Sequence, residues 1–137
     1  MRLLPAAAAL LLAGCGGGPG RTRFETYCAA CHQPDGVGSE GGGPPLDDSP
    51  WVKGPDSRLI RIVLHGLRGP VEVEGRVYDR EMLGFGRILS DGEIASLLTY
   101  LRARFGGGEA VTPESVRRAR TPDREDYWTV AELLEVP

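Results

Sequence analysis

Five consecutive residues combine two thiols and an imidazole at a spacing that suits one kind of chemistry. They are Cys28, Ala29, Ala30, Cys31 and His32. On a helical turn, positions i, i+3 and i+4 lie on one face, so the two thiols and the imidazole point in one direction. Thiols placed in this way can each add to a vinyl group of a porphyrin, while the imidazole reaches the iron from the same side. The motif therefore predicts one haem c, attached covalently through Cys28 and Cys31, with His32 as an iron ligand.

Other uses of two closely spaced cysteines fit the sequence less well. A structural zinc site normally needs four Cys or His ligands, and the whole chain has three Cys and two His. A thioredoxin-like redox pair follows a strand, whereas residues 23–27 show no strand-like alternation of apolar and polar residues. Disulfide exchange would also leave the adjoining His32 without a role. Haem attachment is the preferred interpretation, with zinc binding, disulfide exchange and chance as the alternatives.

A second axial ligand is expected on the face of the haem opposite His32. Met82 lies in a Gly-rich segment, 82–86, in which no helical stripe of apolar residues accounts for it. A thioether opposite an imidazole binds iron and raises its reduction potential. His65 is the alternative and would give a bis-histidine haem, but its place near the end of a predicted helix also suits a histidine beside the last carbonyl groups. Met82 is therefore the preferred ligand.

The segments on either side of the motif must position these ligands. A first helix is expected to start near Arg21 or Thr22 and to run into the motif. Residues 33–45 are rich in Gly and Pro, and a loop of this length with many glycines can wrap closely around one edge of a flat cofactor. Pro44 has no N–H but keeps its carbonyl, which beside His32 would hold the imidazole N–H and set its tautomer. A plain polyproline turn is the alternative.

Three further elements are expected before the tail. A helix begins with Asp56 as its N-cap and ends at Gly66. The alternation over residues 71–78 predicts a small β-hairpin. Ser90 and Glu93 form a capping box and open a helix whose apolar residues recur at i, i+3, i+4 and i+7. This last helix is expected to pack on the first one.

The C-terminal tail also carries signals of order. Thr112-Pro113 can start a short helix, and Thr129 with Glu132 forms a second capping box. Trp128 and Leu134 need apolar cover. Packing on the domain's own surface is the preferred interpretation for these two side chains, and docking to a partner is the alternative.

The N-terminus is similar to that of an exported bacterial lipoprotein. The apolar run over residues 3–12 is too short to span a bilayer, and it ends in Leu-Ala-Gly-Cys at 12–15, which looks like a lipobox. The resemblance implies cleavage before Cys15, lipidation of its thiol, and a position on the periplasmic side of a bacterial membrane. An ordinary signal peptide with an incidental Cys is the alternative. The Gly-rich residues 15–20 would then form a flexible tether.

Length and charge limit the remaining choices. The 137 residues suggest one small domain, and the formal net charge is −3. No basic stripe is present, so nucleic acid is not an expected partner. The expected division is a removed signal peptide over 1–14, a lipidated Cys and tether over 15–20, a haem domain over 21–106 and a C-terminal extension over 107–137. No G-x-S-x-G, Walker or H-E-x-x-H motif indicates an enzyme.

Taken in order, these segments resemble class I cytochrome c over residues 20–105. The matching positions are Gly20, Phe24, Cys28, Cys31, His32, Gly43, Pro44, Leu46, Met82, Leu97 and Tyr100. They correspond to the crossing of the family's first and last helices, its attachment motif, its Gly-Pro-x-Leu stretch and its distal methionine. Leu83 departs from the family, which usually has a proline after that methionine.

The resemblance implies an all-α fold of the class I cytochrome c type, with helices around one covalently bound haem. A small β-hairpin insertion and a short helical C-terminal tail would be added to it. Pro44 would offer its carbonyl to His32, and Met82 would complete the iron coordination. Residues 61–85 are similar to bacterial cytochromes that accompany quinoprotein dehydrogenases or are fused to them.

The implied function is that of an outer-sphere electron carrier and not of an enzyme. Its expected partners are a dehydrogenase, a quinol-oxidising complex or a terminal oxidase, with membrane contact through the lipid. Two alternatives stay open. The chain could be a haem subunit of an enzyme complex, or an open-site haem peroxidase or gas sensor, which needs a vacant sixth position on the iron.

Overall fold

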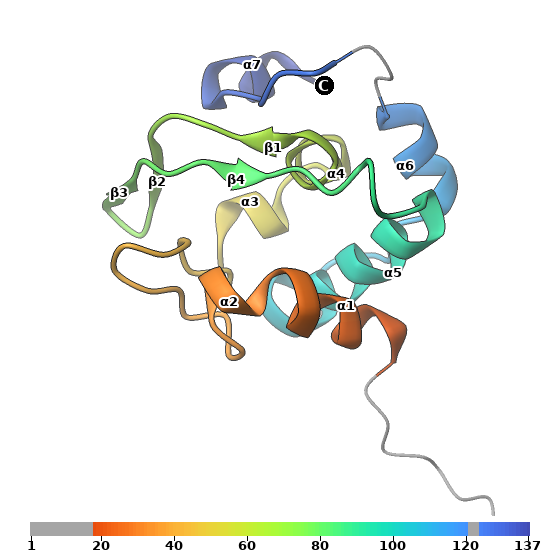
Figure 1. Cartoon of the computed structure of the whole chain (residues 1–137), viewed down its shortest axis with the longest axis horizontal. Coiled ribbons are helices and arrows are strands. Elements are labelled where there is room, and N and C mark those ends of the chain that lie inside the picture. Colours follow the sequence, from red (N-terminus) through yellow and green to blue (C-terminus); the bar gives the residue numbers. More distant parts are fainter. Residues whose placement is uncertain (1–17, 121–123) are drawn as a thin grey trace, which may run out of the picture.

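The computed structural model describes residues 18–120 and 124–137. Figure 1 shows strands β1 and β4 between helix α7 on one side and helices α1 and α2 on the other. In chain order the elements are α1 (Pro19–Tyr27), α2 (Ala29–His32), α3 (Pro50–Lys53), α4 (Asp56–His65), β1 (Gly66–Leu67), β2 (Val71–Val73), β3 (Arg76–Tyr78), β4 (Met82–Leu83), α5 (Asp91–Leu101), the π-helical turn η1 (Arg102–Gly106), α6 (Pro113–Ala119) and α7 (Val130–Glu135).

The N-terminal expectations fall mostly outside this description. The signal peptide proposed over residues 1–14 and the lipidation site Cys15 lie outside the described residues. Among the helices of the described ranges, none is long and apolar enough to cross a membrane.

Helices α1 and α5 cross in direct contact, as the sequence predicts. Phe24 on α1 and Leu97 on α5 are both fully buried in one apolar cluster, and the rings of Phe24 and Tyr100 lie 5.7 Å apart between centroids. Gly20 makes the close approach possible, because a Cβ there would lie 2.2 Å from the carbonyl oxygen of Ser96. This crossing anchors the haem motif, which follows α1 directly.

Helix α1 starts at Pro19, earlier than the predicted start at Arg21 or Thr22. Pro at the first helical position needs no N–H and already has a helical φ, and Gly20 is buried against α5. The predicted tether over residues 15–20 is therefore too long, since its last two residues belong to the folded domain.

Helix α4 shows a second small correction. Pro55 is its N-cap, and Asp56, the predicted cap, is its first residue. The Asp56 carboxylate instead forms an ion pair with Arg102, which is buried. Gly66 ends the helix as predicted, with a φ of +84° that favours glycine.

The two sheets have two strands each. Strands β2 and β3 pair antiparallel, with Val71 opposite Tyr78 and Val73 opposite Arg76, where the alternation predicts a hairpin. The turn between them has positive φ at Glu74 and Gly75, as in a type I′ turn. Strands β1 and β4 also pair antiparallel, although they are far apart in sequence. Strands of two residues are too short for any periodic pattern to predict them.

The tail folds back onto the domain. Helix α6 begins after Thr112, whose side chain accepts a hydrogen bond from the Ser115 N–H, and α7 begins at the predicted capping box of Thr129. Leu133 on α7 is fully buried in a cluster with residues of α4, β1 and β2. Leu134, predicted to need cover, is 54% exposed, because its neighbour Leu133 takes the inner face of the helix.

Candidate haem site

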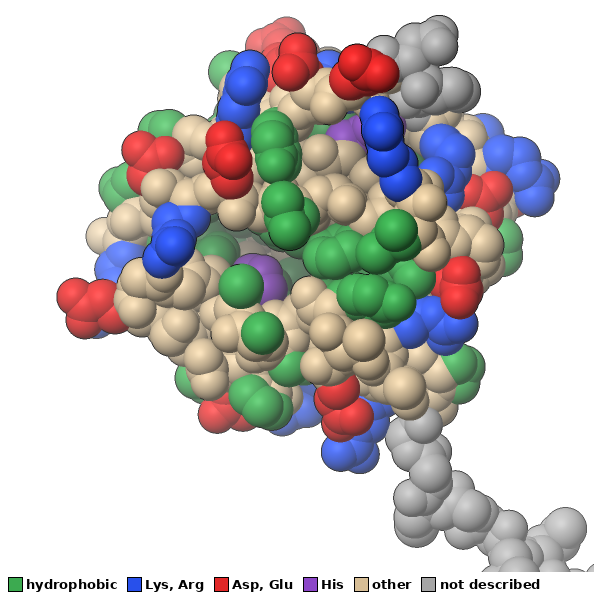
Figure 2. Space-filling view, viewed as in Figure 1, with side chains coloured by type: hydrophobic (Ala, Val, Ile, Leu, Met, Phe, Trp, Pro, Cys, Tyr) green, Lys and Arg blue, Asp and Glu red, His purple; other side chains and the backbone are tan. Residues whose placement is uncertain are grey.

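An apolar cleft separates α2 from β4, and the predicted haem ligands lie on its two sides. Cys28, His32 and Met82 are among the residues that line it. The remaining walls are mostly aliphatic side chains from α3, α4, β1, β2 and the end of α5. Figure 2 shows this hollow on the molecular surface, rimmed by hydrophobic side chains and with a histidine inside it. A concave, largely apolar site with a few polar groups is typical of a cofactor pocket.

His32 is held in one tautomer by the backbone of the Gly/Pro-rich loop. Its ring is buried, and Nδ1 lies 2.8 Å from the carbonyl oxygen of Pro44. Because a carbonyl oxygen only accepts, Nδ1 must carry the hydrogen, and Nε2 is left with a free lone pair. Burial lowers the pKa of His32, and the Pro44 bond partly opposes that shift. The imidazole is therefore in the neutral form that coordinates a metal.

The loop that carries Pro44 is bound to the haem motif by backbone hydrogen bonds. The Gly43 N–H donates to the Cys31 carbonyl at 2.9 Å, and the Gly38 N–H donates to the His32 carbonyl at 2.9 Å. Gly43 also lies flat against the imidazole, since a Cβ on it would be 2.8 Å from Cε1 and Nδ1 of His32. The loop thus fixes both the tautomer and the position of the ring.

The two motif cysteines occupy different environments. Cys28 is buried and lines the cleft, whereas Cys31 is exposed and is not among the lining residues. Burial, with a smaller effect of Cys31, raises the pKa of the Cys28 thiol to about 12. Before haem is attached, Cys28 is therefore a neutral thiol at the cleft wall.

The sequence offers both Met82 and His65 as the second iron ligand, and in the structure the two residues line different cavities. Met82 on β4 lines the same cleft as His32 on α2. His65 lies at the end of α4, lines a different cavity with Arg120 and Tyr127, and has its ring 6.5 Å from that of Trp128. The structure thus brings together Cys28, His32, Pro44 and Met82, and leaves His65 outside the cleft.

Part of the wall was missed by reasoning from the sequence. Helix α3 contributes Trp51 and Val52 to the lining, and it lies in a stretch for which no element is predicted. Its signal is a Ser-Pro pair: the Ser49 side chain accepts a hydrogen bond from the Trp51 N–H, and Pro50 takes the first helical position.

These residues fit a porphyrin iron. The cleft offers one imidazole of fixed tautomer, one thioether and apolar walls, and in the part of the chain that the structure describes no three His, Cys, Asp or Glu side chains gather to hold a bare metal ion. Two protein ligands complete an iron site when a porphyrin supplies the other four. Cys28 and Cys31 would hold the porphyrin, and His32 and Met82 would hold the iron.

Comparison with known proteins places this chain in a family. Residues 18–101 match the family described as cytochrome c oxidase, cbb3-type, subunit III. The chain is 33% identical over 120 residues to cytochrome c-552 of Thermus thermophilus, which covers 80% of this chain and 91% of that protein. It is also 33% identical over 101 residues to the cbb3-type cytochrome c oxidase subunit FixP of Azorhizobium caulinodans, covering 73% of this chain and 33% of FixP.

A third relative is a dehydrogenase component. The chain is 30% identical over 125 residues to the cytochrome c subunit of a quinone alcohol dehydrogenase of Gluconobacter oxydans, covering 84% of this chain and 26% of that subunit. All residues that line the cleft, from Cys28 to Leu101, fall within the matched residues 18–101. The chain therefore belongs to the cytochrome c family, as a mono-haem class I member that binds haem c covalently and transfers electrons.

Proposed function

We propose that the protein is a lipid-anchored electron carrier whose single haem iron is ligated by His32 and Met82. The observation that carries the proposal is the cleft itself, which places His32 and Met82 on one cavity while the Pro44 carbonyl leaves Nε2 of His32 free. Cys28 and Cys31 would form the thioether bonds, and Cys15 would carry the lipid on the periplasmic side of a bacterial membrane. Residues 19–106 would form the haem domain and 107–137 an extension of it.

The chain's own residues would control the electron transfer. Haem c, when bound, supplies an iron that alternates between the ferrous and ferric states. His32 keeps Nδ1–H on Pro44 and stays neutral, Met82 favours the reduced iron, and the aliphatic walls keep water away from it. Electrons would enter and leave near the attachment motif, where Cys31 is exposed. No side chain has to move a proton or attack a substrate.

Two of the relatives suggest which proteins exchange electrons with this one. FixP is a subunit of a cbb3-type oxidase, and the Gluconobacter relative is the cytochrome c subunit of a quinone alcohol dehydrogenase. A terminal oxidase, a dehydrogenase or a quinol-oxidising complex would therefore be a partner of the same class. Whether the chain diffuses on its tether or is a subunit of such a complex can be tested by purifying it from membranes with its partners attached.

Spectroscopy of the holoprotein tests the ligand assignment. Wild-type ferric protein should show the near-infrared sulfur-to-iron charge-transfer band, and the ferrous protein should bind carbon monoxide poorly, because Met82 occupies the sixth position. Met82→Ala should abolish the band and open the iron to carbon monoxide, whereas His65→Ala should leave both unchanged. A wild-type spectrum without the band, combined with rapid carbon monoxide uptake, would instead support the open-site peroxidase or gas sensor.

A further inference from the structure

Strand β4, which carries Met82, pairs with β1, and Trp128 of the C-terminal tail also pairs with β1. These three segments form a small ladder. Met82 on β4 pairs with Leu67 on β1. The Arg68 N–H donates to the Trp128 carbonyl at 2.9 Å, the Trp128 N–H donates to the Gly66 carbonyl at 3.1 Å, and Trp128 forms a parallel bridge with Leu67. Trp128 is therefore hydrogen-bonded to both chain neighbours of Leu67, the residue that pairs with Met82.

At the methionine, the backbone hydrogen bonds of strand β4 are those of its pairing with β1, although the Met82 side chain also packs on the main core. The strand consists of two residues, and Leu83 is 63% exposed. The next bonds to the body of the domain come later, where the Phe85 N–H donates to the Val63 carbonyl and the Gly86 N–H donates to the Leu64 carbonyl. An isolated pair of short strands is marginally stable in water. A third partner on β1 and a covering layer of side chains are what this pair requires.

The tail supplies that layer at Gly66. A Cβ on Gly66 would lie 2.3 Å from the Met82 carbonyl oxygen and 2.7 Å from the ring of Tyr127. The tail and the methionine strand thus approach the same glycine with no side chain between them. Trp128 and Met82 also pack on one apolar cluster, to which the buried residues Leu133 and Leu67 belong.

The Trp128 ring is itself held in place. The Arg124 guanidinium lies 3.6 Å from the ring centroid, Arg61 of α4 lies 5.8 Å from it, and the His65 ring meets it nearly edge-on. Cation–π contacts of this kind stabilise an aromatic ring most where water is excluded. Arg124 is also paired with Glu132 at 2.9 Å, which links the ring to α7.

We propose that Trp128 is a positioning residue that keeps Met82 at the cleft, so that the tail controls how tightly the sixth iron position is closed. The proposal rests on the proposed function, since it requires Met82 to be the ligand. In physical terms, the methionine strand has a closed and an open state, and only the closed state satisfies the contacts of the tail. Removing those contacts shifts the population towards an iron that exogenous ligands can reach.

The test compares Trp128 variants of the full-length holoprotein. Trp128→Ala should raise the carbon monoxide affinity of the ferrous protein about tenfold, and the sulfur-to-iron band of the ferric protein should weaken relative to the wild type. Trp128→Phe should restore most of the wild-type behaviour, because it keeps an aromatic face for Arg124. Leu134→Ala is the matched control within α7, since that side chain is exposed.

A second control separates positioning from general loss of stability. Val116→Ala empties a fully buried site on α6, outside the ladder; it should lower the melting temperature but leave the band and carbon monoxide affinity unchanged. If Trp128→Ala binds carbon monoxide as weakly as the wild type, the proposal is wrong, while a wild-type band still supports Met82 as the ligand. A wild type without the band removes the ligand assignment itself, and the proposal with it.

Hydrogen exchange of the wild type keeps the proposal testable if Trp128→Ala does not fold. Backbone amides in β1, β4 and the tail around Trp128 should open as one cooperative unit, with matching protection. Tail amides that exchange much faster than those of β4, with β4 protected throughout, would show that the tail opens by itself and does not hold the methionine strand.

Discussion

At the scale of single residues, the site depends on how closely the backbone can approach the imidazole of His32. Pro44 fixes the tautomer by accepting from Nδ1, and Gly43 places its Cα against the same ring without a side chain. A ligand held in one orientation needs no rearrangement to meet the iron. The glycine is thus part of the ligand's support, although it has no side chain.

Gly43→Ala should damage the site directly. The added methyl would lie 2.8 Å from Cε1 and Nδ1 of His32, so the ring must turn away from the Pro44 carbonyl. We expect a lower yield of haem-loaded protein and a loss of about 1–3 kcal/mol in the free energy of unfolding, measured by haem staining after denaturing electrophoresis and by thermal melting. Gly92→Ala is the control: a Cβ there has nothing within 4 Å, and alanine favours a helix. Equal haem yields from the two variants would contradict the role of Gly43.

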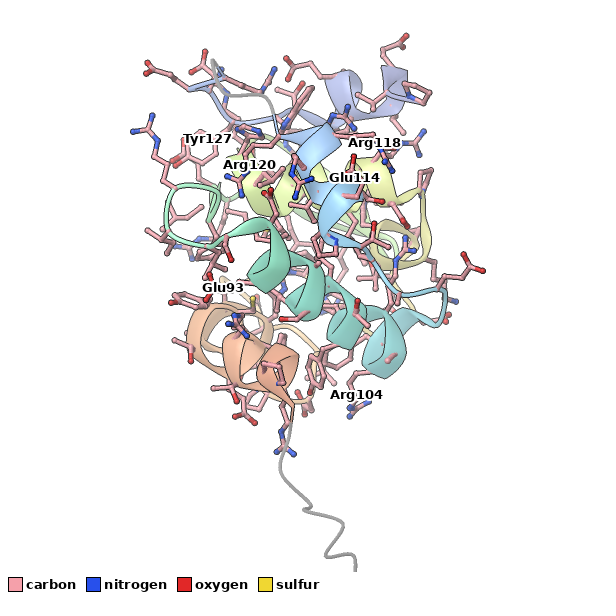
Figure 3. The ribbon with its side chains drawn as sticks, turned by 90° about the vertical axis from the view of Figure 1, so that its right-hand side faces the viewer. Glu93, Arg104, Glu114, Arg118, Arg120 and Tyr127 are labelled. Atoms are coloured by element: carbon pink, nitrogen blue, oxygen red, sulfur yellow. The ribbon has the colours of Figure 1, made fainter. Side chains whose placement is uncertain are left out.

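At the scale of elements, the α1–α5 crossing combines a close backbone contact with an ion pair. Figure 3 shows Glu93 near the start of α5, where this helix meets α1. Its carboxylate accepts from Arg23 of α1 at 2.9 Å and from the Ser90 N–H at 2.9 Å. The side-chain hydrogen bond from Arg23 is the main cause that lowers the pKa of Glu93 to about 2, and the bonds from Ser90 add to it.

This pKa shift predicts how acid affects the crossing. Glu93 titrates lower in the folded chain than its unshifted value of 4.5, so its contribution to stability is fully present above that pH and is lost as the pH falls towards 2. Glu93→Gln should therefore melt at a lower temperature than the wild type at pH 6, with the difference disappearing near pH 2. Glu109→Gln, at an exposed carboxylate, should show no such difference. A gap between wild type and Glu93→Gln that persists at pH 2 would contradict the assignment.

The sequence predicts the elements that carry local signals and misses those that carry none. The crossing of Phe24 and Leu97 and the caps at Ser90 and Thr129 follow from periodicity and side-chain capping, which are local properties. Strand β1 and strand β4 cannot be predicted in this way, because each has two residues and becomes a strand only by meeting its partner. The ladder through Trp128 is missed for the same reason, although Trp128 itself is identified as a residue that needs cover.

The sequence likewise identifies the main residues of the haem site but not the parts of the site that depend on packing. Cys28, His32 and Met82 are identified from residue type and from the resemblance, and the structure places all three on one cleft. The sequence leaves open whether Met82 or His65 is the second iron ligand. That choice depends on the position of β4 in the fold, which local sequence signals do not give. The apolar wall from α3 also depends on packing, apart from the local Ser49-Pro50 signal.

At the scale of the whole molecule, the proposed lipid on Cys15 and the start of the folded domain are close together in the sequence. No helix among residues 18–120 and 124–137 is suited to crossing a bilayer. Helix α1 begins at Pro19, so a lipid on Cys15 would be joined to the folded domain by only a few residues. The haem cleft would then stay close to the membrane surface.

Cys15→Ser tests this arrangement in cells that export the protein. The variant should move from the membrane fraction to the soluble fraction, because it cannot be lipidated, while its haem spectrum stays that of the wild type. Fractionation with haem staining measures both. A Cys15→Ser protein that remains with the membranes would show that attachment is through a partner or through an uncleaved leader.

The aliphatic walls of the cleft have a further consequence, for the speed of the reaction. When the charge on the iron changes by one unit, every nearby dipole that is free to turn must adjust, and that adjustment makes up much of the activation barrier. Side chains such as Leu59, Ile62 and Val63 have almost no dipole, and close packing holds them in place. With haem bound, these walls would change little between the two charge states of the iron, which would lower the part of the barrier that comes from rearrangement of the surroundings.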